Sequence, residues 1–199
     1  MNDRQNKRRR SLRLQGYDYS RPGAYFITIC TKNGECLFGE IVADKMVMND
    51  AGKMVQRIWN DLTLRFMNVE LDELIIMPNH IHGIIILHGR GEPCVRPDAT
   101  HTIVLVDHKP GDHKDRPYGT LPDTVGRIIQ AFKSETTHAY IHGIKNNGWP
   151  RFSGKLWQPN YYDHIIRNEK QFNKIRDYII NNPKKWQLDR ENPIFRQLQ

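Results

Sequence analysis

The sequence predicts one α+β domain, and two features of its pattern lead to this prediction. Short runs of aromatic and branched residues bounded by turn residues, such as AYFITICT at 24–31, are typical of buried strands. Longer segments with apolar residues at four-residue spacing are typical of helices that pack on a sheet. A chain of 199 residues is long enough to give one such domain a substantial core.

The first part of the chain is expected to contain a basic arm, a strand and a hairpin. Residues 1–22 are rich in Lys and Arg and have little to bury, so we expect a flexible arm. Such an arm either is a solvated tail or binds phosphates nonspecifically. A strand over 24–31 follows, and then a short hairpin with strands at 40–42 and 46–48.

Two helices are predicted, one before and one after the central strands in the sequence. Asn49 or Asp50 can cap a helix that ends near Phe66, because apolar residues recur there at four-residue spacing. A second helix is expected to begin near Pro122 and to end at Gly143, with an apolar face formed by Val125, Ile128, Ile129, Phe132, Tyr140 and Ile141.

Residues 71–87 carry the most informative pattern in the chain. Two apolar runs flank Pro78-Asn79, which predicts a pair of strands joined by a tight turn. Because side chains alternate along a strand, His80 and His82 point to one face and Ile81 to the other. Paired imidazoles on a rigid strand are half of a divalent-metal site, although a His-x-His pair can also simply follow a turn.

An irregular segment follows the second of these strands. Apolar periodicity is lost from about 88 to 119, which predicts an insertion loop whose histidines are mostly solvated: His88, His101, His108 and His113. Residues 156–166 then predict a bend into a final strand. Tyr161 and Tyr162 in this segment are available either to pack or to stack on bases.

The last predicted helix covers 168–182 and stops at Pro183. Its buried stripe is expected to consist of Phe172, Ile175 and Ile179. Tyr178 and Asn182 are four residues apart, so they share one edge of the helix and can act on one centre. This edge is a candidate second half of the site that His80 and His82 begin.

Composition narrows the environment and the class of partner. Thirty Lys and Arg against 22 Asp and Glu give a net charge of +8, which suits a polyanion, and nucleic acid above all. The three cysteines form no CxxC pair, so the sequence suggests neither a disulfide framework nor a four-cysteine zinc site. No apolar stretch approaches the roughly 20 residues that cross a bilayer, and no signal peptide is apparent. We therefore expect no membrane partner and a cytoplasmic, nucleoid-associated location.

Four motifs together resemble one known family. MPNHIHGIII at 77–86, AFKSETTH at 131–138, LWQPNYYDHIIRNEKQF at 156–172 and RDYIINNPKKW at 176–186 are similar to the REP-associated tyrosine transposases. These belong to the single-tyrosine HUH superfamily, which is defined by a histidine-hydrophobic-histidine motif. The resemblance covers most of the chain, with the motifs in the family's order.

The resemblance implies a fold, an activity and a partner. The fold would be a ferredoxin-like antiparallel sheet with helices mainly on one face and a C-terminal helix carrying the tyrosine. The catalytic domain would occupy 23–187, including the insertion at about 88–119, and a tail would cover 188–199. The activity would be that of a transposase-like single-stranded DNA endonuclease and strand transferase that binds hairpin DNA, as a monomer or a homodimer.

The resemblance also assigns roles to individual residues. Tyr178 would be the nucleophile, and His80 and His82 would hold a divalent metal, most plausibly Mg2+ or Mn2+. Asn182 would complete the metal site one turn after the tyrosine, and alternatively it simply ends a helix before a proline. A metal lowers the barrier to attack by the phenol, whose ordinary pKa is about 10, by withdrawing charge from the scissile phosphate.

Several alternatives remain open at this point. Tyr161 or Tyr162 can be the nucleophile instead of Tyr178. Gln158 and His164 can support the site or contact the DNA, and the alternative that we favour for them is a packing or surface role. The protein can also be a catalytically silent DNA-binding protein. A third possibility is a metal hydrolase in which an acidic residue such as Asp72 or Glu73 joins the histidines to activate water.

Overall fold

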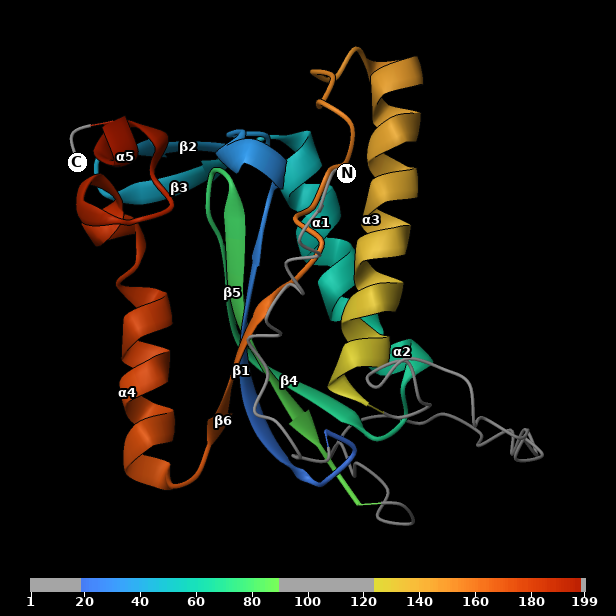
Figure 1. Cartoon of the computed structure of the whole chain (residues 1–199), viewed down its shortest axis with the longest axis vertical. Helices are drawn as coiled ribbons and strands as arrows, with labels where there is room; N and C mark the ends of the chain where they lie inside the picture. The colour runs from blue at the N-terminus through green and yellow to red at the C-terminus, as the bar shows by residue number, and fades with distance from the viewer. Residues whose placement is uncertain (1–18, 90–123, 198–199) are drawn as a thin grey trace, which may run out of the picture.

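The computed structural model describes residues 19–89 and 124–197, so most of the expected basic arm and insertion loop lie outside the described residues. A four-stranded antiparallel sheet forms the centre of the molecule in the order β4-β5-β1-β6 (Figure 1). Its strands are β1 (Gly23–Cys30), β4 (Val69–Ile76), β5 (His80–Leu87) and β6 (Tyr162–Ile166). The two central strands, β1 and β5, pair along their whole length, from Gly23 opposite Leu87 to Cys30 opposite His80.

The order of elements confirms the predicted fold class. Along the chain, β1 is followed by α1 (Asp50–Asn60), then β4 and β5, then α3 (Val125–Asn147), and finally β6. This βαββαβ succession with an antiparallel sheet is the ferredoxin-like arrangement. A small separate hairpin, β2 (Gly39–Val42) and β3 (Lys45–Met48), lies between β1 and α1, as predicted.

The helices α1 and α3 cover one face of the sheet together with the short helix α2 (Leu62–Arg65) (Figure 1). The Asn49 side chain caps α1 by accepting a hydrogen bond from the Gly52 backbone N–H. The helix predicted to reach Phe66 is interrupted at Asp61. There the Leu64 N–H donates to the Asp61 carbonyl, and the Thr63 hydroxyl donates to the Asn60 carbonyl in place of the helical N–H.

The prediction that Gly143 ends the second long helix is wrong. Gly143 lies inside α3, which runs on to Asn147 and ends at Gly148 with a φ of +68°. The absence of a side chain at Gly143 serves packing instead, since a Cβ there would lie 2.1 Å from Cε3 of the Trp149 ring. A glycine in a helical pattern therefore marked a close contact with Trp149 and not a helix end.

The opposite face of the sheet is covered by α4 (Glu169–Ile180), the helix that carries Tyr178 (Figure 1). A small apolar cluster holds it there, formed by Phe26, Ile84, Ile166 and Ile179, with Phe172 and Ile175 packed around them. At the edge of the sheet the Arg176 guanidinium also binds the Asp72 carboxylate of β4. After α4 the chain forms the 3-10 segment η2 (Pro183–Leu188) and the short helix α5 (Pro193–Gln197).

Within the described part of the chain, no helix is long and apolar enough to span a membrane.

Candidate active site

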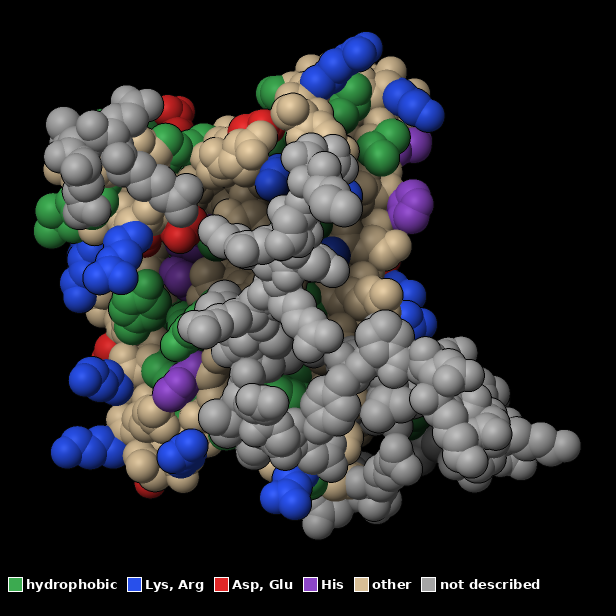
Figure 2. Space-filling model, in the orientation of Figure 1, with side chains coloured by type: hydrophobic (Ala, Val, Ile, Leu, Met, Phe, Trp, Pro, Cys, Tyr) green, Lys and Arg blue, Asp and Glu red, His purple; other side chains and the backbone are tan. Residues whose placement is uncertain are grey.

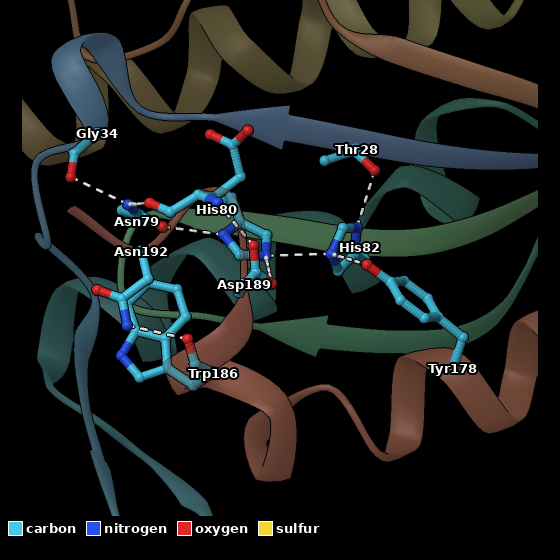
Figure 3. Close-up of polar contacts among 10 residues, drawn as sticks. Thr28, Gly34, Asn79, His80, His82, Tyr178, Trp186, Asp189 and Asn192 are labelled. Atoms are coloured by element: carbon cyan, nitrogen blue, oxygen red, sulfur yellow. Dashed lines mark hydrogen bonds and ion pairs between the residues drawn. The ribbon is translucent and has the colours of Figure 1, made fainter. Parts of the chain in front are cut away.

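The site begins with two imidazoles at the start of the central strand β5. His80 and His82 point to the α4 side of the sheet, whereas Ile81 between them belongs to the core on the other side, as the alternation predicts. His80 is 0% exposed and His82 is 5% exposed. Their Nε2 atoms are 3.1 Å apart, so both rings direct the same nitrogen to one point (Figure 3).

Hydrogen bonds behind the rings determine which nitrogen of each is available. The Asn79 amide nitrogen donates to the carbonyls of Gly34 and Glu191, so its Oδ1 faces His80 and accepts from the His80 Nδ1–H at 2.9 Å. With its proton on Nδ1, His80 keeps a lone pair on Nε2. The Thr28 hydroxyl lies 2.8 Å from Nδ1 of His82 and can accept its proton in the same way. This is how outer-shell residues prepare histidines as metal ligands.

The electrostatics favour neutral, metal-binding imidazoles. Burial lowers the pKa of His82 well below its ordinary value, the neighbouring His80 lowers it further, and Asp189 acts in the opposite direction. His82 is therefore uncharged at neutral pH, with a lone pair to donate.

Asp189 completes a group of three potential metal ligands, and sequence reasoning missed it. Its Oδ2 lies 3.8 Å from Nε2 of His80, and the ligand atoms of His80, His82 and Asp189 all lie within 4.8 Å of one another. The Glu191 backbone N–H donates to its other carboxylate oxygen at 2.7 Å, which fixes the orientation of the side chain. Two imidazoles and a carboxylate form a mixed donor set for a divalent metal, because imidazole nitrogen suits transition metals and carboxylate oxygen suits Mn2+ and Mg2+.

Tyr178 reaches this group from α4. Its hydroxyl lies 3.4 Å from Nε2 of His82 (Figure 3). Its ring and the Phe26 ring make an edge-on contact at a centroid distance of 6.0 Å. Burial raises the pKa of the Tyr178 phenol above its ordinary value, Asp189 and Glu191 raise it further, and the Asn182 side chain lowers it. The phenol is thus protonated at neutral pH and needs a positive charge nearby to become a good nucleophile.

Asn182 lies just beyond the C-terminal end of α4, and its side chain is buried, with 2% of the residue exposed. Its Oδ1 is buried and makes no hydrogen bond to any of the described residues. A buried carbonyl oxygen without a donor costs free energy unless another group satisfies it. Because Asn182 shares a hollow with His82, Tyr178 and Asp189, a cation bound in that hollow is a suitable partner.

This hollow has a volume of about 680 Å3 and lies between the exposed part of the sheet face and the segment after α4. Besides the residues above, Phe26, Thr28, Tyr161, Tyr162, Lys185 and Arg190 line it. Figure 2 shows histidine and acidic side chains in a depression on this face, with Lys and Arg side chains on the α4 side of it. The volume is ample for a metal ion and part of a nucleotide.

The other residues proposed from sequence take different positions. Asp72 is paired with Arg176 at the edge of the sheet and is not part of the histidine group. Tyr161 lines the hollow, and Nζ of Lys133 lies 5.7 Å from the centroid of its ring. Tyr162 lies on β6 at the rim of the hollow and is 48% exposed. His164 pairs with Gln171, their nitrogens being 2.6 Å apart, while Gln158 lines the hollow.

Comparison with known proteins places the chain among relatives. No family model matches it. A protein of Haemophilus influenzae strain Rd, itself uncharacterized, is 40% identical over 185 residues, which cover 91% of each chain. Among solved structures, the REP-associated tyrosine transposase bound to a REP hairpin aligns over 85% of this chain and 71% of its own, with a TM-score of 0.51 and 20% identity. That likeness confirms the fold that the sequence motifs imply.

Proposed function

The chain belongs to the family of the Haemophilus influenzae protein and has the fold of the REP-associated tyrosine transposase, and we propose that it is a transposase-like endonuclease and strand transferase acting on single-stranded DNA. One observation carries this proposal: a tyrosine hydroxyl lies 3.4 Å from a buried pair of histidines that an aspartate accompanies. A structural tyrosine on a covering helix has no need of such a neighbourhood.

His80, His82 and Asp189 would hold a divalent metal, Mg2+ or Mn2+, with Asn182 as a further oxygen ligand. The residues fit such an ion because both imidazoles expose Nε2 and because Asn182 Oδ1 has no hydrogen-bond donor among the described residues. When bound, the metal would polarise the scissile phosphate and neutralise charge that develops on it. Hard cations such as these favour oxygen ligands and readily keep positions for phosphate oxygens.

Tyr178 would supply the nucleophile. Its phenolic oxygen attacks phosphorus, the bond from phosphorus to the 3′ oxygen breaks, and the released 3′ oxygen takes up a proton while the phenol proton passes to water. The product is a 5′-phosphotyrosine ester. Attack of a second DNA 3′ hydroxyl on this ester releases Tyr178 and joins the strands without a nucleotide cofactor. Tyr178 is 41% exposed and lines the hollow, which supports access of DNA to this residue.

The arrangement supports a site completed within one chain. Tyr178 lies beside His82 of the same chain, which supports strand cleavage by the residues of a single protomer. Hairpin DNA is the substrate that the solved transposase suggests, since that protein is bound to a REP hairpin. The net charge of +8 also suits a polyanionic substrate.

The test is a search for a covalent protein–DNA adduct. The full chain is incubated with hairpin-bearing single-stranded DNA and Mn2+, and the products are separated under denaturing conditions. We expect an adduct that Tyr178→Phe abolishes and that Tyr161→Phe and Tyr162→Phe retain. A chelator should prevent it.

The outcomes separate this proposal from its competitors. Binding without cleavage in the wild type identifies a catalytically silent DNA-binding protein. If the DNA is cleaved without an adduct, and Tyr178→Phe still cleaves it, the protein is a metal hydrolase. The acidic residue beside the histidines would then be Asp189, and not Asp72 or Glu73. Either result overturns the tyrosine mechanism.

A further inference from the structure

A second hollow adjoins the active site on the other side of Tyr178. It has a volume of about 640 Å3 and lies between α4 and β6. Four residues line both hollows, namely Phe26, Tyr162, Tyr178 and Lys185. The two hollows are therefore parts of one trough, and the Tyr178 ring stands where they meet.

The second hollow is basic. Lys174, Lys184 and Lys185 line it, against one acidic residue, Asp177. Within the described residues, none of these lysines makes an ion pair, and Lys184 donates only to the Asn181 side-chain oxygen at 3.3 Å. Ammonium groups without acidic partners beside an open hollow are suited to phosphates. Figure 2 shows Lys and Arg side chains along this side of the molecule.

An exposed aromatic ring stands beside these lysines. Tyr162 is 48% exposed, so about half of the residue is accessible, and its ring makes a T-shaped contact with the Phe26 ring at a centroid distance of 6.5 Å. Tyr162 is paired across the sheet with Thr28, whose hydroxyl holds His82. One strand, β1, therefore lies between Tyr162 and the strand that carries His82. Bases stack on such rings with little regard to sequence.

Local hydrogen bonds fix the residues of β6 and α4 that line the second hollow near Tyr162. His164 projects from the same side of β6 as Tyr162, and Gln171 of α4 holds it at 2.6 Å. Gln171 also accepts a hydrogen bond from the Arg167 N–H, and it donates its own N–H to the Asn168 cap. The connection between β6 and α4 is thus held in one geometry, which keeps the second hollow open.

From this geometry we propose that the trough is a track for single-stranded DNA on both sides of the scissile phosphate, with Tyr162 as the stacking platform for a base and Lys174, Lys184 and Lys185 as phosphate contacts. The inference rests on the proposed function, because it takes the substrate to be a single strand. It adds a binding site that neither the histidines nor Tyr178 provides. In a duplex the faces of the bases are covered by neighbouring base pairs, so no base is free to stack on the Tyr162 ring.

Binding can be measured without chemistry. In a Tyr178→Phe background, a fluorescein-labelled single strand of twelve thymidines is titrated with the full chain, and anisotropy reports the affinity. We expect Tyr162→Ala to weaken binding about tenfold and Tyr162→Phe to leave it within about twofold, because the ring and not the hydroxyl stacks. Tyr162 is half-exposed, so its loss leaves the core intact.

The lysines are tested through salt. Lys174→Gln and Lys184→Gln should each reduce the slope of log affinity against log salt concentration by about 0.7, the value for one phosphate contact on a single strand. Lys145→Gln is the matched control, because Lys145 lies on α3 on the other face of the sheet. These variants keep the proposal testable if Tyr162→Ala fails to fold.

The proposal is overturned if Tyr162→Ala binds the single strand as tightly as its parent, if Lys145→Gln lowers the slope as much as Lys174→Gln, or if a duplex of equal length binds equally well. Its failure is distinct from that of the proposed function. An adduct in the wild type with unaffected binding in Tyr162→Ala overturns the track alone. Loss of binding in Tyr162→Ala without any wild-type adduct overturns the tyrosine chemistry alone.

Discussion

The two faces of the sheet are built for different purposes. Under α1 and α3 lies a large apolar cluster rich in aromatic rings, including Trp59, Phe132, Tyr140 and Trp157. Under α4 the buried cluster consists of Phe26, Ile84, Ile166 and Ile179, with partly buried apolar residues around it, and the same face of the sheet also carries the buried polar residues His80 and His82. Each fully buried large apolar side chain contributes about 1.5–3 kcal/mol. The first face therefore supplies most of the stability. The second face can accommodate the buried histidines, Asp189 and the Asn182 side chain, whose Oδ1 accepts no hydrogen bond from the described residues.

The largest effect is expected from Phe132→Ala on the first face. The Phe132 ring packs edge-on against Trp59 at 5.3 Å and also contacts Trp157, so truncation should cost about 3–5 kcal/mol of unfolding free energy. Chemical denaturation measures it. Phe172→Ala on the α4 face is the matched variant and should cost clearly less, because Phe172 is only partly buried. Equal costs would contradict the contrast between the faces.

For the second face, we expect metal binding to increase the unfolding free energy of the protein. At a Mn2+ concentration of about 100 times its dissociation constant, the wild type should gain about 2.7 kcal/mol of unfolding free energy. Asp189→Asn removes a charged ligand with little change of shape, so most of this gain should be lost. Thermal unfolding of each protein with Mn2+ and with a chelator measures the difference. An undiminished gain in Asp189→Asn would remove Asp189 from the ligand set.

Gly83→Ala tests how tightly β5 packs against α1 on the first face of the sheet. A Cβ at Gly83 would lie 2.5 Å from Cζ2 of Trp59, so the substitution should cost about 1–3 kcal/mol by overpacking. Adding Trp59→Phe should recover part of the loss, which a double-mutant cycle by denaturation would detect. Purely additive losses would show that the ring of Trp59 does not cause the strain.

The smallest effect concerns the ion pair that holds α4 to β4. Asp72 of β4 pairs with Arg176 of α4. The hydrogen bond from Arg176 is the main reason that the pKa of Asp72 is lowered from its ordinary value, and partial burial acts in the opposite direction. A carboxyl whose folded pKa is lowered stabilises the fold above its unfolded pKa, and that stability is lost as pH falls through the folded pKa. The unfolding free energy of Asp72→Asn should therefore depend less on pH below about 4 than that of the wild type. Identical pH profiles would show that the pair is too solvated to matter.

Local rules predicted much of the fold and half of the candidate site. Strand alternation placed His80 and His82 on one face, and helical spacing placed Tyr178 at the edge of an apolar stripe that packs on the sheet. Both inferences depend on residues only a few positions apart, for which the geometry of a strand or helix is sufficient.

The parts that could not be predicted depend on contacts between distant residues. Asp189 lies more than 100 positions from His80 and follows a 3-10 segment with no spacing signal, so only the folded chain brings them together. Asn79 looked like a turn residue, yet its amide fixes the tautomer of His80 through the carbonyl of Glu191. Whether Asn182 binds the metal stays a prediction.

The irregular pairing of β4 also bears on how molecules of this protein behave in a crowded solution. β4 is an edge strand, and its register with β5 shifts between Leu71 and Leu74, where Asp72 leaves the ladder to meet Arg176. A regular edge strand presents unpaired N–H and C=O groups that can pair with a strand of another molecule, whereas a bulged and charged edge strand hinders such pairing. The same irregularity that binds the tyrosine helix thus makes the β4 edge of the sheet a poor template for strand pairing with another molecule.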